Sequence, residues 1–129
     1  MATSGKQALL AIATTVVIIA AGNAVAESNK WRLEFSGSAQ SAGTIVLELA
    51  APGEEPKQAT IAIAEGTAEN MVAKAVVVGL RAQSTGERFS AERDDGEDVL
   101  VKKKYGEPDF TVAVVSNTVE GVRIRVERE

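Results

Sequence analysis

We predict seven short strands in the chain after residue 26, most of which alternate apolar and polar residues with a period of two. This spacing places the apolar side chains on one face, which is typical of a strand with one buried face. The stretches are 31–35, 44–49, 58–64, 87–92, 99–101, 110–114 and 122–126. In the first of them Trp31, Leu33 and Phe35 share the apolar face. Because the turn between the second and third stretches is short, these two are expected to form an antiparallel hairpin.

One segment between the third and fourth stretches changes to the helical period. Its apolar face follows the i, i+3, i+4, i+7 rule through Ala68, Met71, Val72, Ala75, Val76, Gly79 and Leu80. This predicts an amphipathic helix of about four turns, with Thr67 as the N-cap and Arg81 near the negative end of the helix dipole. The pattern as a whole predicts an α+β fold, a small and mostly antiparallel sheet of about seven strands with the helix packed on one face.

The first 26 residues have a different pattern from the rest of the chain. A polar start with Lys6 is followed by an apolar run over 8–21 and by the small residues Ala24-Val25-Ala26. These three parts predict a secretory signal peptide over 1–26, cleaved before Glu27, and a single domain over 27–129. The alternative is an uncleaved apolar helix that anchors the chain in a membrane, which takes about 20 apolar residues.

The signal peptide predicts where the domain works. We expect it in the periplasm of a bacterial cell or outside the cell, and at the membrane only if the N-terminal helix is retained. The formal net charge of the whole chain is −4, and the sequence has no long basic run. Since nucleic-acid affinity depends on neutralising phosphates, the sequence excludes nucleic acid as an expected partner.

Catalytic chemistry has little support in the composition. The chain contains neither Cys nor His, so it has no disulfide or thiolate and lacks the commonest general base and metal ligand. A Ser–Lys pair could use Ser84, Ser90 or Ser116, but none of them lies in a Gly-x-Ser-x-Gly elbow. We therefore predict that the protein is not an enzyme and has no cofactor, and a small hydrolase is the least favoured alternative.

An acidic hairpin over 92–98 is the one candidate metal site. Oxygen-rich loops of this kind can bind Ca²⁺, which takes six to eight oxygen ligands. The ligands would be Asp94, Asp95, Glu97 and Asp98. The simpler interpretation is a solvated hairpin tip in which Asp95-Gly96 makes the turn. A ligand-binding or Ca²⁺-binding module is therefore the second function that the sequence offers.

Two features are candidate partner contacts. Trp31 is the only Trp and could anchor a partner, although its place on the apolar face of a strand also suits a core residue. The basic run of Lys102, Lys103 and Lys104 could contact a polyanion or a lipid headgroup, or simply be a solvated strand end.

The middle of the chain resembles a module of phage tail proteins and of flagellar hook and filament-associated proteins. In that module an alternating strand runs into an acidic-Gly-Thr turn and a short Ala-rich helix, followed by a strand pair ending in a Gly-x-Pro-Phe-like turn. The matching residues are 59–67, 72–75 and 106–112. The resemblance implies a structural or adhesive module and transfers no functional residues.

The leading prediction is a noncatalytic, exported structural or interaction domain that acts by protein–protein contact. A β-rich domain has edge strands whose free backbone groups can pair with another chain. The expected partner is another protein or a second copy of this chain, in a surface or periplasmic assembly.

Overall fold

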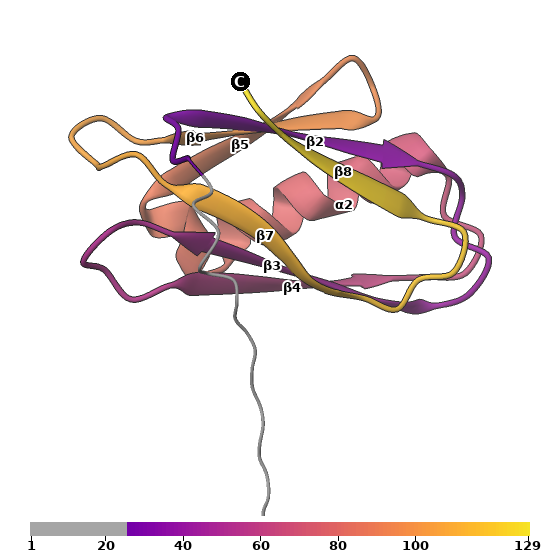
Figure 1. Cartoon of the computed structure of the whole chain (residues 1–129). Helices are drawn as coiled ribbons and strands as arrows, with labels where there is room; N and C mark the ends of the chain where they lie inside the picture. The colour runs from indigo at the N-terminus through magenta and orange to yellow at the C-terminus, as the bar shows by residue number, and fades with distance from the viewer. Residues whose placement is uncertain (1–25) are drawn as a thin grey trace, which may run out of the picture.

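The computed structural model describes residues 26–129, and the predicted signal helix lies outside them. Its elements, drawn in Figure 1, are β2 (Lys30–Ser36), β3 (Gly43–Ala50), β4 (Lys57–Ile63), α2 (Glu69–Ala82), the 3₁₀ turn η2 (Ser84–Glu87), β5 (Phe89–Asp94), β6 (Asp98–Lys103), β7 (Thr111–Asn117) and β8 (Arg123–Arg128). The α+β class, the seven strands and the helix are confirmed. In the described part of the chain, no helix has the length and apolar character needed to cross a membrane.

The strands form two antiparallel sheets, not the single sheet that the sequence suggested. One sheet has the order β5-β6-β2-β8 and the other the order β4-β3-β7. The predicted hairpin is present as β3 and β4, with Ile45 opposite Ile61. Each sheet buries one face against the other, which is why β2 and β8 alternate apolar and polar residues. Alternation identifies the buried face of a strand but not its neighbours.

The helix α2 lies along one side of the molecule, where β4 and β5 form the edges of the two sheets (Figure 1). It contacts both sheets, so its buried surface is wider than one sheet would need. The buried residues are Val72, Ala73, Val76, Val77 and Leu80. The expectation that Met71 lies on the buried face is wrong, because its side chain is 47% exposed. Because the helix contacts two sheets, its buried face includes Ala73 and Val77.

The start of α2 also differs from the sequence prediction. Ala68, not Thr67, occupies the N-cap position, and no side chain caps the helix there. Thr67 Oγ1 instead donates to the carbonyl of Ala64 at 2.6 Å. Glu69 in the first turn accepts a hydrogen bond from the N–H of Gly37 at 2.8 Å. The helix start is therefore held by the turn that follows β2.

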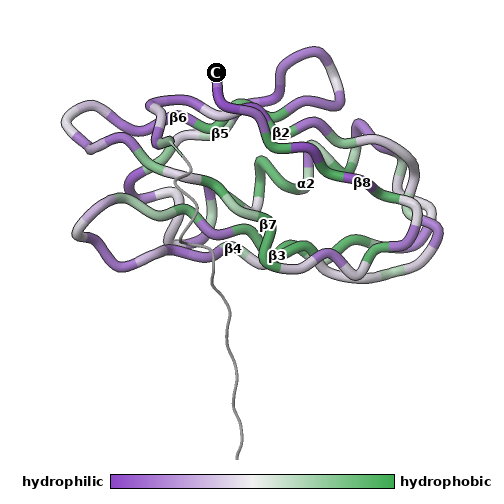
Figure 2. Tube along the Cα trace, in the orientation of Figure 1, coloured by the Kyte–Doolittle hydropathy of each residue, from purple (hydrophilic) through white to green (hydrophobic). Residues whose placement is uncertain are grey.

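The core lies between the two sheets. Its fully buried large side chains include Leu33, Phe35, Ile45, Leu47, Leu49, Val72, Val76, Val99, Val101 and Phe110. Figure 2 shows hydrophobic segments of β3, β7 and α2 around this interior. Three partly buried apolar residues, Val114, Ile124 and Val126, pack against the core from the side opposite α2. The core is therefore less completely covered on the side of β7 and β8.

Candidate functional site

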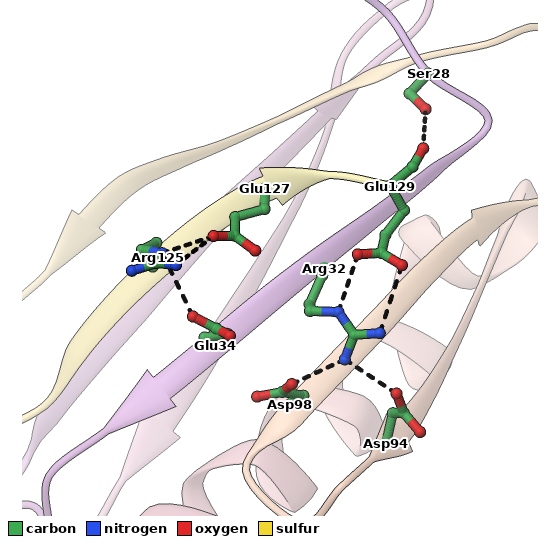
Figure 3. A network of polar contacts seen from close by, with 8 residues as sticks. All are labelled: Ser28, Arg32, Glu34, Asp94, Asp98, Arg125, Glu127 and Glu129. Atoms are coloured by element: carbon green, nitrogen blue, oxygen red, sulfur yellow. Dashed lines mark hydrogen bonds and ion pairs between the residues drawn. The ribbon is translucent and has the colours of Figure 1, made fainter.

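The acidic hairpin predicted from the sequence supplies two carboxylates to an arginine-centred cluster, shown in Figure 3. Arg32 Nη1 lies 2.8 Å from Asp98 Oδ2 and 3.0 Å from Asp94 Oδ2, while its Nε lies 3.0 Å from Glu129 Oε2. The sheet brings them together because Asp94 pairs with Asp98 across the hairpin and Arg32 lies on the adjacent strand. Three acids from two distant parts of the chain thus share one guanidinium.

This cluster changes the titration of its members. The hydrogen bond from Arg32 lowers the pKa of Glu129, because it stabilises the ionised carboxylate. The hydrogen bond to Glu129, followed by those to Asp94 and Asp98, raises the pKa of Arg32. Arg32 therefore stays positively charged among its three acidic neighbours and offsets part of their repulsion.

The other two predicted calcium ligands lie away from this cluster. Asp95 is exposed at the hairpin tip in the left-handed region, with φ 54°, and Glu97 contributes its carbonyl to a hydrogen bond from the N–H of Phe35. Over residues 26–129 no three acidic side chains are arranged to hold a metal ion. Asp94 and Asp98 make ion pairs, and calcium binding by the hairpin stays a prediction that calorimetry can check.

The Arg32 cluster predicts an acid-dependent loss of stability. Since the pKa of Glu129 is lower in the folded protein than its usual value of 4.5, its stabilising effect is present above that pH and is lost as the pH falls through the folded-state pKa. We expect Arg32→Gln to lower the Tm at neutral pH and to flatten the fall in Tm below about pH 4.5. Circular dichroism melts across this pH range would measure both effects.

The matched control for this prediction is Arg123→Gln. Arg123 is an exposed arginine of β8 on the same sheet face, and no ion pair to it is found among the described residues. It should keep the wild-type dependence of Tm on pH. If Arg32→Gln and the wild type lost stability equally on acidification, the cluster would have no part in acid stability.

The predicted partner contacts are not brought together. Trp31 is only 4% exposed, and its Nε1–H donates to the carbonyl of Phe110 at 2.8 Å, so it serves as a core residue. Lys103 Nζ pairs with Asp109 Oδ1 at 3.0 Å, and Lys104 Nζ donates to the carbonyl of Gly86 at 2.7 Å. The half-buried Lys102 lies opposite Lys30.

A second charged group lies at the β8 end of the same sheet face. Arg125 pairs with Glu34 at 3.4 Å and with Glu127 at 2.5 Å, as Figure 3 shows. Nearby is an open groove of about 570 Å³, whose lining includes Arg123, Arg125, Glu34 and Asp98. Both charge signs line this groove, and most of its charged groups already have partners. It therefore shows no preference for an anion or a cation.

The sheet edges on the α2 side are covered by side chains from the end of the helix. Gln83 Oε1 accepts from the N–H of Thr60 at 3.0 Å, and its Nε2 donates to the carbonyl of Thr60 at 2.8 Å. This amide occupies outward backbone groups of β4. Arg81 Nε donates to the carbonyl of Ala91 on β5 at 2.8 Å. Both edges are therefore obstructed for an incoming strand, although a shallow groove remains between Met71 and Ala62.

The edge of β7 on the opposite side is open. Backbone groups of successive residues in a strand alternate between its two sides. Phe110 directs its N–H and carbonyl away from β3, to Ser28, so Val112 and Val114 also direct theirs to this side. In the described part of the chain these groups of Val112 and Val114 have no hydrogen-bond partner. They are available to another strand.

The edge of β8 faces the same opening. Glu129 donates its N–H to Lys30 of the adjacent segment at 3.1 Å, so the alternate residues Ile124 and Val126 direct their backbone groups away from β2. Within residues 26–129 nothing pairs with them. The strands β7 and β8 contact each other and lie together at the front of Figure 1. Two open edges and three half-buried side chains thus occur on one side of the molecule.

Comparison with protein-family models, with curated proteins and with solved structures finds no match for this chain. The sequence predicts edge strands but does not identify them. One signal is present in β7, because 112–115 is Val-Ala-Val-Val and has no polar residue between the valines. Val115 accordingly lies 52% exposed on the outer face of β7.

Proposed function

We propose that this protein is a noncatalytic, exported interaction domain that acts by protein contact through the open edges of β7 and β8. The observation that carries the proposal is the difference between the two sides of the molecule. On one side Arg81 of α2 and Gln83, the residue after the helix, bond to the edge backbones. On the other, outward backbone groups of β7 and β8 have no partner within residues 26–129 and lie beside half-buried valines and an isoleucine.

Strand addition at these edges suits the physical chemistry of the surface. A free edge offers a row of N–H and carbonyl groups to an extended chain. Each backbone hydrogen bond made there contributes about 0.5–1.5 kcal/mol net. Covering the exposed parts of Val114, Ile124 and Val126 adds roughly 25 cal/mol for each Å² of apolar surface removed from water. Backbone pairing provides affinity, and the apolar residues favour one register.

Proline substitutions at the open edges test the proposal. Val114→Pro and Val126→Pro each remove one outward N–H without removing a hydrogen bond of the existing sheets. We expect both variants to remain folded and to lose association, whether with a second copy or with a partner. Light scattering after size-exclusion chromatography would measure self-association, and titration calorimetry with a partner purified from the periplasm would measure binding.

The control is Gln58→Pro, which removes an outward N–H from the β4 edge beside α2. It should associate as the wild type does. A wild-type protein that is strictly monomeric and binds no periplasmic component would contradict the proposal. So would an equal loss of association in the control, because the open edges would then have no special part.

A further inference from the structure

The end of the domain where β2 begins carries three lysines without a counterion. Lys30 of β2 lies directly opposite Lys102 of β6, and Lys104 continues the same ladder, since its N–H donates to the carbonyl of Arg88 at 3.0 Å. In the described part of the chain none of the three pairs with an acid. Like charges on directly opposite residues repel each other, so the folded domain retains a repulsion here that a bound anion would relieve.

Several acids of the same end already have cationic partners. The pairs are Glu129 with Arg32 at 3.0 Å, Glu107 with Arg88 at 3.1 Å and Asp109 with Lys103 at 3.0 Å. Glu27 and Glu92 make no ion pair among residues 26–129, and the three lysines outnumber them. This end therefore carries a surplus of positive charge, which we call the basic end.

The acidic hairpin tip lies at the other end of the same strands. The register of β5 with β6 places Lys102 opposite Ser90 and Asp98 opposite Asp94. The four residue steps from Lys102 to Asp98 extend over about 13 Å, and exposed charges are screened beyond about 8 Å at physiological salt. The negative net charge of the whole chain therefore leaves the basic end locally positive.

The turn between β6 and β7 presents the only tyrosine of the chain at this end. Tyr105 is fully exposed, and Figure 1 shows the turn projecting beyond the strands. The backbone of the turn is ordered, because Glu107 donates its N–H to the carbonyl of Lys104 at 3.0 Å and Gly106 has φ +87°, as in a type II turn. An exposed aromatic ring is therefore held in place next to Lys104.

The predicted signal segment joins the domain at the same end. Asn29 accepts a hydrogen bond from the N–H of Lys103 at 3.2 Å, so a segment over 1–26 would hold the basic end next to the bilayer during export. We propose that Lys30, Lys102, Lys104 and Tyr105 bind the surface of an anionic lipid bilayer and keep the domain at the membrane after the signal peptide is cleaved. This inference does not depend on strand pairing at β7 and β8.

A bilayer suits these four side chains better than a soluble anion does. Each lysine close to an anionic membrane surface strengthens binding about fivefold. Tyrosine is favoured at the boundary between lipid headgroups and acyl chains, where its ring is removed from water while its hydroxyl stays hydrated. A soluble polyanion would attract the lysines but would give no such site to Tyr105.

Vesicle binding by the mature chain over 27–129, which contains the whole described core, is the test. We expect it to bind vesicles of phosphatidylcholine and phosphatidylglycerol about tenfold or more tightly than vesicles of phosphatidylcholine alone, and to be released by high salt. Lys30→Gln combined with Lys102→Gln should weaken this binding about tenfold or more. Tyr105→Ala should also weaken it, and cannot disturb packing because the side chain is fully exposed.

The matched control combines Lys74→Gln with Arg123→Gln. It removes the same charge from two exposed residues that have no ion pair in the described chain, so it should bind vesicles as the wild type does. Circular dichroism melts would show that all variants are folded. Equal binding to the two kinds of vesicle, or an equal loss in both double variants, would overturn the proposal. Binding to inorganic polyphosphate without binding to anionic vesicles would overturn it too, in favour of a soluble polyanion.

Discussion

Replacing Trp31 with alanine is expected to lower the free energy of unfolding by about 3–5 kcal/mol, the usual cost of removing a large buried aromatic side chain. The indole is 4% exposed and donates to the carbonyl of Phe110, so it joins β2 of one sheet to the start of β7 in the other. A domain of this size has a total stability of about 5–15 kcal/mol. Urea denaturation followed by circular dichroism would measure the change.

Trp31→Phe is the control, because it keeps most of the apolar volume and removes only the indole N–H. The carbonyl of Phe110 still accepts from the N–H of Ser28, so it is not left without a partner. The loss should be about 1–2 kcal/mol, from one buried hydrogen bond and a small change in volume. If Trp31→Ala cost no more than Trp31→Phe, the indole would not contribute to the core as described.

Replacing Gly37 with alanine is expected to cost about 2–5 kcal/mol, from left-handed backbone strain of about 1–2 kcal/mol and overpacking of about 1–3 kcal/mol. Gly37 has φ +89°, and a Cβ there would overlap the carbonyl oxygen of Gly121. This contact joins the turn after β2 to the turn before β8. Neither backbone can retreat easily, since Gly37 N–H is also bonded to Glu69.

Gly66 separates these two contributions. It has the same φ of +89°, but a Cβ there would meet nothing within 4 Å. Gly66→Ala should therefore show the conformational strain alone, about 1–2 kcal/mol. Thermal and urea denaturation of both variants would give the difference. If both variants lowered the free energy of unfolding equally, the close approach of Gly37 to Gly121 would add nothing to the cost of a Cβ at position 37.

The sequence predicted the elements of this fold because their signals are local. Trp31, Leu33 and Phe35 alternate with charged residues, and all three are buried on β2. The helix was found from its period, but its buried face was placed too close to Met71. That error has a physical cause. A helix that packs on one sheet and a helix that packs between two sheets have the same spacing of apolar residues, but the second buries a wider part of its surface.

The candidate sites needed information that periodicity does not contain. The acids of the hairpin were recognised as a cluster, but their counterion Arg32 lies 62 residues from Asp94 and 66 from Asp98. Only the pairing of β2 with β6 brings them together. The open edges depend in the same way on strand order, which alternation leaves undetermined. Gln83 likewise gave no sequence signal, because any exposed Gln after a helix has the same local pattern.

The position of α2 also sets how many neighbours the domain can have through backbone pairing. The last turn of the helix and the residue after it bond to both β4 and β5, so the proposed strand pairing is confined to the side of β7 and β8. A molecule that can pair strands on only one side forms dimers and cannot form a continuous fibre. Under the proposed function, the helix thus limits this β-rich domain to a valency of one. If the end of α2 unwound, the valency would rise to two, and fibre growth would become geometrically allowed.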